Sequence, residues 1–162
     1  MVDLADLIES LQREVNAPGI SQLPNAVDDD YLGNLRDGFW EAVLDGVISG
    51  YDEDEGIVSP VDTNGTDLTR ELQQLVVFYA GYRIVRNQLR DMKTVFRTKA
   101  GPVEYEVQQA ATVLKAILDD LTYKRNYLLG RLSDSGQTST HIIDAIVNRS
   151  DQQYYGDSWF VR

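Results

Sequence analysis

Apolar residues recur at three- and four-residue steps along most of the chain, and this spacing places them on one face of an α-helix. The longest unbroken run predicts a helix from about Asp67 to Phe96. At 1.5 Å per residue, such a helix is roughly 45 Å long. The stripe comprises Leu68, Leu72, Leu75, Tyr79, Tyr82, Val85, Leu89, Met92 and Phe96.

A second long run follows the sequence KAGP at positions 99–102 and predicts a returning helix. Pro102 is compatible with a first helical turn, where Glu104 and Glu106 complement the positive end of the helix dipole. We expect this helix to end before Gly130. Because only a few residues join the two helices, they must fold back as an antiparallel hairpin over about 67–129. The predicted hairpin turn consists of Lys99, Gly101 and Pro102.

Two shorter helical patterns precede the hairpin. The first uses Leu4, Leu7, Ile8, Leu11 and Val15, and the second follows the acidic run 28–30 and uses Leu32, Leu35, Phe39, Val43 and Val47. Interior glycines cost up to about 1 kcal/mol each relative to alanine. We therefore expect packing to stabilise the second helix, with a close approach to another element at one of its glycines. These glycines are Gly33, Gly38 and Gly46.

The segment from Gly50 to Thr66 is acidic and rich in turn residues, and we interpret it as an exposed loop or a short hairpin. It contains part of a calcium-loop pattern, with Asp62, Asn64, Gly65 and Glu71 at suitable positions. However, the first position of that pattern is Pro60, whose side chain has no ligand atom. A turn followed by a helix N-cap explains the same residues.

The remainder of the chain has weaker patterns. The apolar stretch Ile142 to Val147 is compatible with a helix or a strand, and the residues after it lack helical periodicity. We therefore predict an all-α fold, a helical bundle built around the long antiparallel hairpin. A single domain covers 1–150, and an extended C-terminal tail covers 151–162.

The composition of the chain limits the possible functions. The formal net charge is −11, from 26 acidic and 15 basic residues, which repels the phosphate backbone and disfavours binding to duplex DNA. The same charge suits a surface that DNA must pass without sticking. The chain has no cysteine, so thiolate chemistry and disulfides are excluded. No apolar run is long enough for a membrane span, and the N-terminal stretch lacks a basic segment, so we expect a soluble, non-secreted protein.

Catalytic patterns are weak. The single histidine, His141, has Ser139 and Asp144 nearby, but triads are defined by spatial geometry and not by adjacency in sequence. No phosphate-binding glycine motif occurs. We therefore predict no enzymatic activity, no catalytic residue, no cofactor and no metal.

Two groups of residues suggest contacts with other proteins. A basic stripe on one face of the third helix is either a solvated face near the helix C-terminus or a contact with an acidic neighbour, such as another copy of this chain. Its members are Arg83, Arg86, Arg90, Lys93 and Arg97. The tail is rich in aromatic residues that favour interfaces, and it either docks on a partner or neighbouring protomer, or folds back. The candidate docking residues are Tyr154, Tyr155, Trp159, Phe160 and Arg162.

Three segments carry a resemblance to a known family: DDDYLGNLRDGFWEAVLDGVISGY, LTRELQQLVVFYAGYRIVRNQLRDMKTVF and FRTKAGPVEYEVQQAATVLKAILDDL. From about 28 to 129 the chain resembles head-tail connector proteins of tailed bacteriophages, particularly head-to-tail adaptors of phages that infect actinobacteria. They share a helical layout and a junction of a basic residue, alanine and glycine.

The resemblance implies a structural virion protein that forms a ring beneath the portal, usually a dodecamer. The ring extends the DNA channel and presents a surface to the stopper or neck protein. It also implies location at the head-tail interface, with assembly in the host cytoplasm. On this basis the turn at 99–102 matches the hairpin junction of the family, and the aromatic tail occupies the place of a portal-docking terminus. The alternative is a small dimeric helical interaction or regulatory module.

Overall fold

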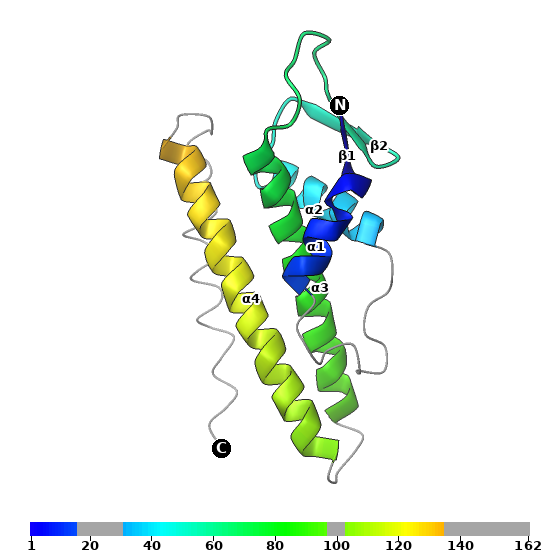
Figure 1. Ribbon diagram of the computed structural model, residues 1–162, viewed down its shortest axis with the longest axis vertical. Helices are drawn as coiled ribbons and strands as arrows, with labels where there is room; N and C mark the ends of the chain where they lie inside the picture. The colour runs from blue at the N-terminus through cyan, green and yellow to red at the C-terminus, as the bar shows by residue number, and fades with distance from the viewer. Residues whose placement is uncertain (16–30, 97–102, 135–162) are drawn as a thin grey trace.

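The structure, a computed structural model, describes residues 1–15, 31–96 and 103–134. This part of the chain is mostly helical (Figure 1). A short 3-10 helix η1 (Leu4–Leu7) leads into α1 (Ile8–Val15), and α2 (Tyr31–Leu44) follows. The two long helices are α3 (Arg70–Phe96) and α4 (Val103–Asp134).

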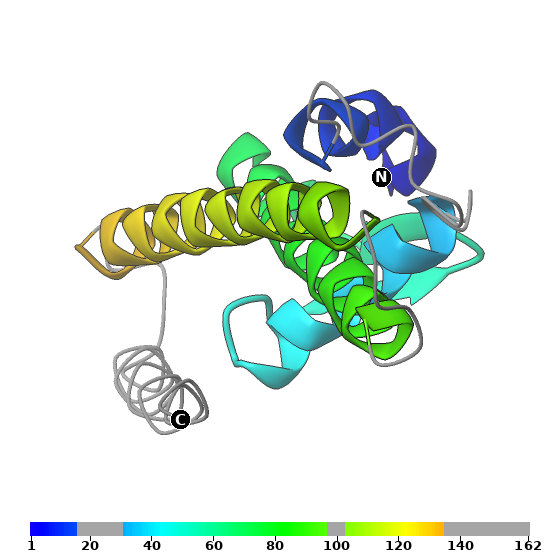
Figure 2. The same ribbon diagram turned by 90° about the horizontal axis from the view of Figure 1, so that it is seen from below.

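The central element is α3, which packs against α1, α2 and α4. Figure 1 shows α3 and α4 side by side and antiparallel, as the sequence predicts, and Figure 2 shows the same helices from below. The predicted turn at 99–102 lies outside the described residues. A helix that contacts three others must be apolar on most sides, and α3 is buried continuously from Leu75 to Gly81.

A small antiparallel sheet makes the all-α prediction incomplete. It consists of β1 (Val2–Asp3), β2 (Tyr51–Asp54) and β3 (Ile57–Pro60), in the order β1-β3-β2. Of the two structures expected for this segment, a loop or a short hairpin, residues 51–60 form the hairpin. Its two-residue turn has positive φ at both Glu55 (50°) and Gly56 (95°), as tight hairpin turns require. The sequence pattern did not indicate this sheet, because β2 is acidic and β1 has only two residues. Moreover, β1 pairs with a strand more than 50 residues away.

The sheet is not wholly exposed, because its side chains alternate between two faces. Val58 is buried whereas its neighbour Ile57 is exposed. Glu53, which pairs with Val58 in the register, is buried as well. The prediction of an exposed segment is therefore wrong for these two residues, since one face of the hairpin packs on the helices.

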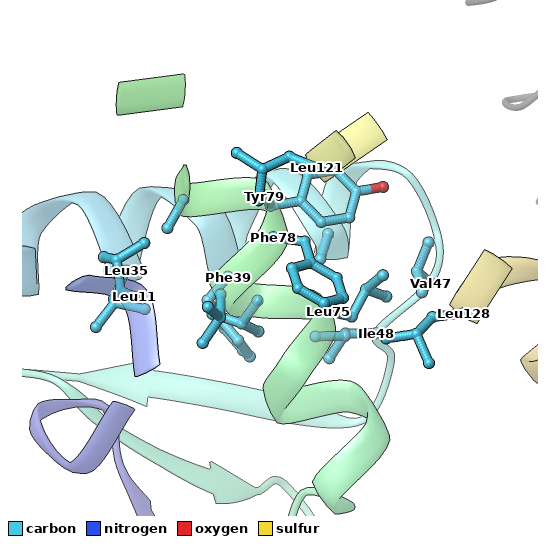
Figure 3. Close-up of a cluster of buried hydrophobic side chains, with 14 of the residues drawn as sticks. Leu11, Leu35, Phe39, Val47, Ile48, Leu75, Phe78, Tyr79, Leu121 and Leu128 are labelled. Carbon is cyan, nitrogen blue, oxygen red and sulfur yellow. The ribbon is translucent and has the colours of Figure 1, made fainter. Parts of the chain in front are cut away.

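The hydrophobic core includes buried residues from η1 to the end of α4, and Figure 3 shows a part of it. The largest side chains in it that are fully buried include Leu11, Leu35, Phe39, Leu75, Tyr79 and Leu121. Burying a leucine or phenylalanine side chain contributes roughly 1.5–3 kcal/mol. The four helices α1, α2, α3 and α4 therefore share one core.

Helix ends differ from the predicted ones. α2 ends at Leu44, because Gly46 has a φ of 72° and the amides of Gly46 and Val47 donate to the carbonyls of Val43 (3.0 Å) and Ala42 (3.0 Å). This glycine-based helix cap places Val47 after the helix, where it is still buried.

The two long helices also have corrected ends. α3 begins at Arg70 and not at Asp67, whose carboxylate is ion-paired with the amino terminus. α4 runs through Gly130 to Asp134 instead of ending before Gly130. The burial of Leu129 and Leu132 explains this continuation, because packing outweighs the low helix propensity of one glycine.

The predicted close approach at a glycine occurs at Gly38. A Cβ atom there would lie 2.8 Å from the Ala80 amide nitrogen and 3.0 Å from the Val76 carbonyl oxygen. Both neighbours are backbone atoms of α3, which cannot move aside as a flexible side chain would. The backbones of α2 and α3 therefore meet directly at this point.

We expect Gly38→Ala to lower the free energy of unfolding by about 1–3 kcal/mol, the usual cost of overpacking a close contact. Urea denaturation monitored by circular dichroism measures this change. Gly130→Ala is the matched control, because a Cβ at Gly130 meets no atom within 4 Å. The control should gain up to about 1 kcal/mol from helix propensity. Equal stabilisation of both variants would contradict the contact.

Candidate interaction surfaces

A polar cleft of about 410 Å³ lies between α2, β2 and α3. Its walls come from three separate elements, and the packing of α2 on α3 brings the two helices together. The side chains that define it are Arg36, Asp37, Trp40, Glu53, Arg83 and Asn87.

Glu53 forms one wall of this cleft, and its side chain is only 1% exposed. Its carboxylate accepts hydrogen bonds from Arg36 Nε (2.7 Å), Trp40 Nε1 (3.0 Å) and the Gly56 amide (2.7 Å). These donors come from α2 and from the β-hairpin turn. The buried carboxylate therefore links the sheet to α2.

The pKa of Glu53 lies below its ordinary value of 4.5. Burial by itself raises the pKa, because it disfavours the charged form. The hydrogen bonds from Gly56, Trp40 and Arg36, together with the positive charge of Arg36, outweigh burial and stabilise the carboxylate. Glu53 is therefore charged near neutral pH, and its role is structural within this network.

The structure describes only part of the basic stripe. Arg83 lies against α2, where it is ion-paired with Asp37 (2.7 Å) and Glu41 (3.3 Å). Arg86 and Arg90 are exposed, and Arg90 lies 3.9 Å from Asp91. The side chain of Lys93 and the whole of Arg97 lie outside the described residues. In this structure Arg83 therefore joins α3 to α2 within one chain.

Two adjacent cations on α4 have contrasting surroundings. Lys124 is ion-paired with Glu14 (2.7 Å) and Asp120 (2.8 Å), so it connects α4 to α1. Burial lowers the pKa of Lys124, but these two carboxylates outweigh burial and raise the pKa above 10.5. The ammonium group of Lys124 therefore stays charged at neutral pH and loses its proton only when the pH rises through this raised pKa.

Arg125 is buried between two tyrosine rings of α3. Its Cζ atom lies 5.3 Å from the centroid of Tyr79 and 5.2 Å from that of Tyr82. Each cation–π contact contributes up to about 2 kcal/mol when desolvated. Burying a cation without an ion pair costs several kcal/mol, and no described carboxylate is ion-paired with Arg125. The sequence signal was an arginine four residues after Leu121, within the apolar run of the returning helix.

Tyr79 also connects this arginine to Asp45, the residue that follows α2. Its hydroxyl donates to Asp45 Oδ2 at 2.7 Å, while one face of its ring meets Arg125. Figure 3 shows the hydroxyl of Tyr79 at the edge of the apolar cluster.

The side of α4 turned away from α3 carries exposed aromatic residues. Tyr123 is 70% exposed and Tyr127 is 58% exposed. They are four residues apart and hence neighbours on one face of the helix. Val113, at 40% exposure, and the exposed Ala116 continue this face. We call these four residues the α4 outer face.

Other predicted residues fall outside the described chain, namely the tail residues, His141 and the turn residues. Of the calcium-loop pattern, Glu71 lies in α3 and is ion-paired with Arg131 at 3.2 Å, while Asp62 is exposed. The described residues contain no group of three or more His, Cys, Asp or Glu side chains placed to hold a metal ion. None of the described helices is long and apolar enough to cross a membrane.

Comparisons of the chain with protein-family models, curated proteins and solved structures find no match.

We expect Glu53→Gln to lower the free energy of unfolding near neutral pH by about 1.5–3 kcal/mol, the contribution of a hydrogen bond to a charged group. Because the folded-state pKa lies below 4.5, the stabilisation is present above that pH and is lost as the pH falls below it. The difference between the two proteins should therefore shrink in acid. Urea denaturation over a pH series measures it.

Glu9→Gln is the control, because Glu9 is exposed and its one ion pair among the described residues is with the exposed Arg13. Exposed pairs of this kind contribute little, so no measurable change is expected. An equal loss in both variants would contradict the structural role of Glu53.

Proposed function

We propose that this protein is a structural connector of a tailed bacteriophage. It acts as a head-to-tail adaptor that forms a homo-oligomeric ring, a dodecamer, beneath the portal. The ring extends the DNA channel and links the capsid to the stopper or neck protein. The protein is then located at the head-tail interface of the virion, after assembly in the host cytoplasm.

The observation that carries this proposal is the α4 outer face. Exposed tyrosines spaced four residues apart favour contact with another protein, because a tyrosine buries a large rigid area at low entropic cost. The described part of α4 has 32 residues, which corresponds to a length of roughly 48 Å. A helix of this length, packed on α3, offers a rigid wall for side-by-side assembly.

The biological setting comes from the resemblance to head-tail connectors. The resembling region, about 28 to 129, includes α2, α3 and most of α4. The net charge of −11 suits a channel through which DNA passes, since the wall repels the phosphate backbone.

The first test concerns the tail, for which we propose docking to the portal. Deletion of the residues after Asp151 should abolish attachment to portal-bearing capsids, because Tyr154, Tyr155, Trp159 and Phe160 are lost together. Negative-stain microscopy measures attachment, with rings expected for the full chain. The full chain with Glu9→Gln is the control and should still attach, because Glu9 is exposed on α1 and is not one of the candidate docking residues. Normal attachment of the truncated protein would show that the tail assignment is wrong.

The second test concerns the α4 outer face. The double variant Tyr123→Ser and Tyr127→Ser should weaken self-association by roughly tenfold or more, because buried interface tyrosines often contribute 1–2 kcal/mol each. Both side chains are mostly exposed in the single chain, so the free energy of unfolding should change little. Sedimentation velocity measures association.

The same experiment separates the rival function. A tight dimer whose mass does not change on addition of portal protein would favour the small dimeric interaction or regulatory module. Unchanged association of the double variant would exclude the α4 outer face as the contact.

A further inference from the structure

The described cations follow a pattern with one exception. Most of them form ion pairs with carboxylates, namely Arg13, Arg36, Arg83, Arg90, Lys124 and Arg131. Three others, Arg70, Arg86 and Lys115, are exposed and therefore hydrated. Among the side chains that the structure describes, Arg125 alone is a cation that is buried, at 8% exposure, and that has no ion pair.

The surroundings of Arg125 satisfy only part of its chemistry. Tyr79 and Tyr82 offer ring faces, which attract the cation but accept no hydrogen bonds in the plane of the guanidinium. The Nε atom is fully buried and has no hydrogen-bond partner in the described chain. A guanidinium carries five N–H donors in a planar fork, and the group that matches this fork is a carboxylate or a phosphate.

We propose that Arg125, held between Tyr79 and Tyr82, is a receptor site for a carboxylate side chain of a second copy of this chain. The choice of partner rests on the homo-oligomeric assembly proposed above. Each copy carries 26 acidic residues against 15 basic ones, so carboxylates are the commonest charged groups on an approaching copy. Contact between two acidic chains is repulsive unless carboxylates meet cations, and Arg125 is a cation whose charge no described carboxylate compensates.

The partial exposure of Arg125 and the positive charge near it are consistent with this assignment. Arg125 is not completely enclosed, and Tyr82 is only half-buried. The exposed Arg86 follows Tyr82 by one helical turn, so it adds positive charge on the same side of α3. A carboxylate reaching this point would be partly dehydrated, which strengthens charge-assisted hydrogen bonds.

The test compares the full chain with Arg125→Met and with Lys115→Met. Both variants remove one positive charge from α4, but Lys115 is exposed. By sedimentation velocity, Arg125→Met should weaken self-association roughly tenfold or more, as expected when one partner of a dehydrated charge pair is removed. Lys115→Met should change it little. Circular dichroism and unfolding at high dilution confirm that both variants fold.

A purely structural role gives the opposite pattern. In that case Arg125→Met would be less stable at high dilution and would still associate normally, which would overturn the proposal. The proposal expects unchanged or higher stability, because a buried charge without an ion pair is removed.

A second measurement does not require assembly. Glutarate should raise the melting temperature of dilute wild-type protein and of Lys115→Met, relative to sodium chloride at equal ionic strength, but not that of Arg125→Met. Glutarate protection in a wild-type protein that never self-associates would overturn the second copy as occupant together with the proposed ring. Self-association that is indifferent to Arg125→Met would overturn the site and leave the ring standing. Arg125-dependent binding of a short DNA duplex, without an effect of glutarate, would identify phosphate as the ligand and overturn the carboxylate.

Discussion

The arrangement of this protein depends on the direct contact between the backbones of α2 and α3 at Gly38. No side chain separates the helices at this point, since even a Cβ atom would lie 2.8 Å from the Ala80 amide nitrogen. This contact brings the polar edge of α2 against α3, where Arg83 meets Asp37 and Glu41. It also turns Arg36 and Trp40 toward the β-hairpin, where they hold Glu53. The cleft between the three elements is a consequence of the same contact.

Two charged side chains, Glu53 and Arg125, are buried, and their surroundings differ. Glu53 is buried but has three donors, so its carboxylate remains charged and links the sheet to α2. Arg125 is buried too, yet the part of the chain that the structure describes gives it aromatic faces and no counter-ion. In an acidic chain, a cation in this position costs stability, and the proposed pairing with a second copy would give it a physical reason. The α4 outer face adds apolar area on another side of the same helix.

The helices were predictable because their signal is local. The apolar stripe of α3 and the short connection to α4 require a helical hairpin whatever else surrounds them. Helix ends were predicted less well. Val47 continues the apolar spacing of α2 but lies beyond its cap, because the positive φ of Gly46 ends the helix. Gly130 has the opposite error, because buried leucines on both sides carry α4 through it.

The candidate surfaces were predicted poorly, because burial of a charged residue depends on what packs over it. An acidic segment is normally exposed, and only the sheet with its N-terminal strand brings Glu53 inside. Arg125 interrupts an apolar stripe, a signal that counting apolar positions alone overlooks.

Local features of the sequence predicted the helical periods, the reversal between α3 and α4, and a close approach of α2 at one of its three glycines. These follow from local spacing and backbone freedom, which act within a few residues. The folded chain was needed to show that Gly38 is the glycine in contact, that a three-stranded sheet forms, that Glu53 is buried, and that Arg125 lies against two tyrosine rings. These depend on contacts between segments far apart in the chain, and the desolvation that they impose on a charge is a property of the packed surroundings and not of the residue alone.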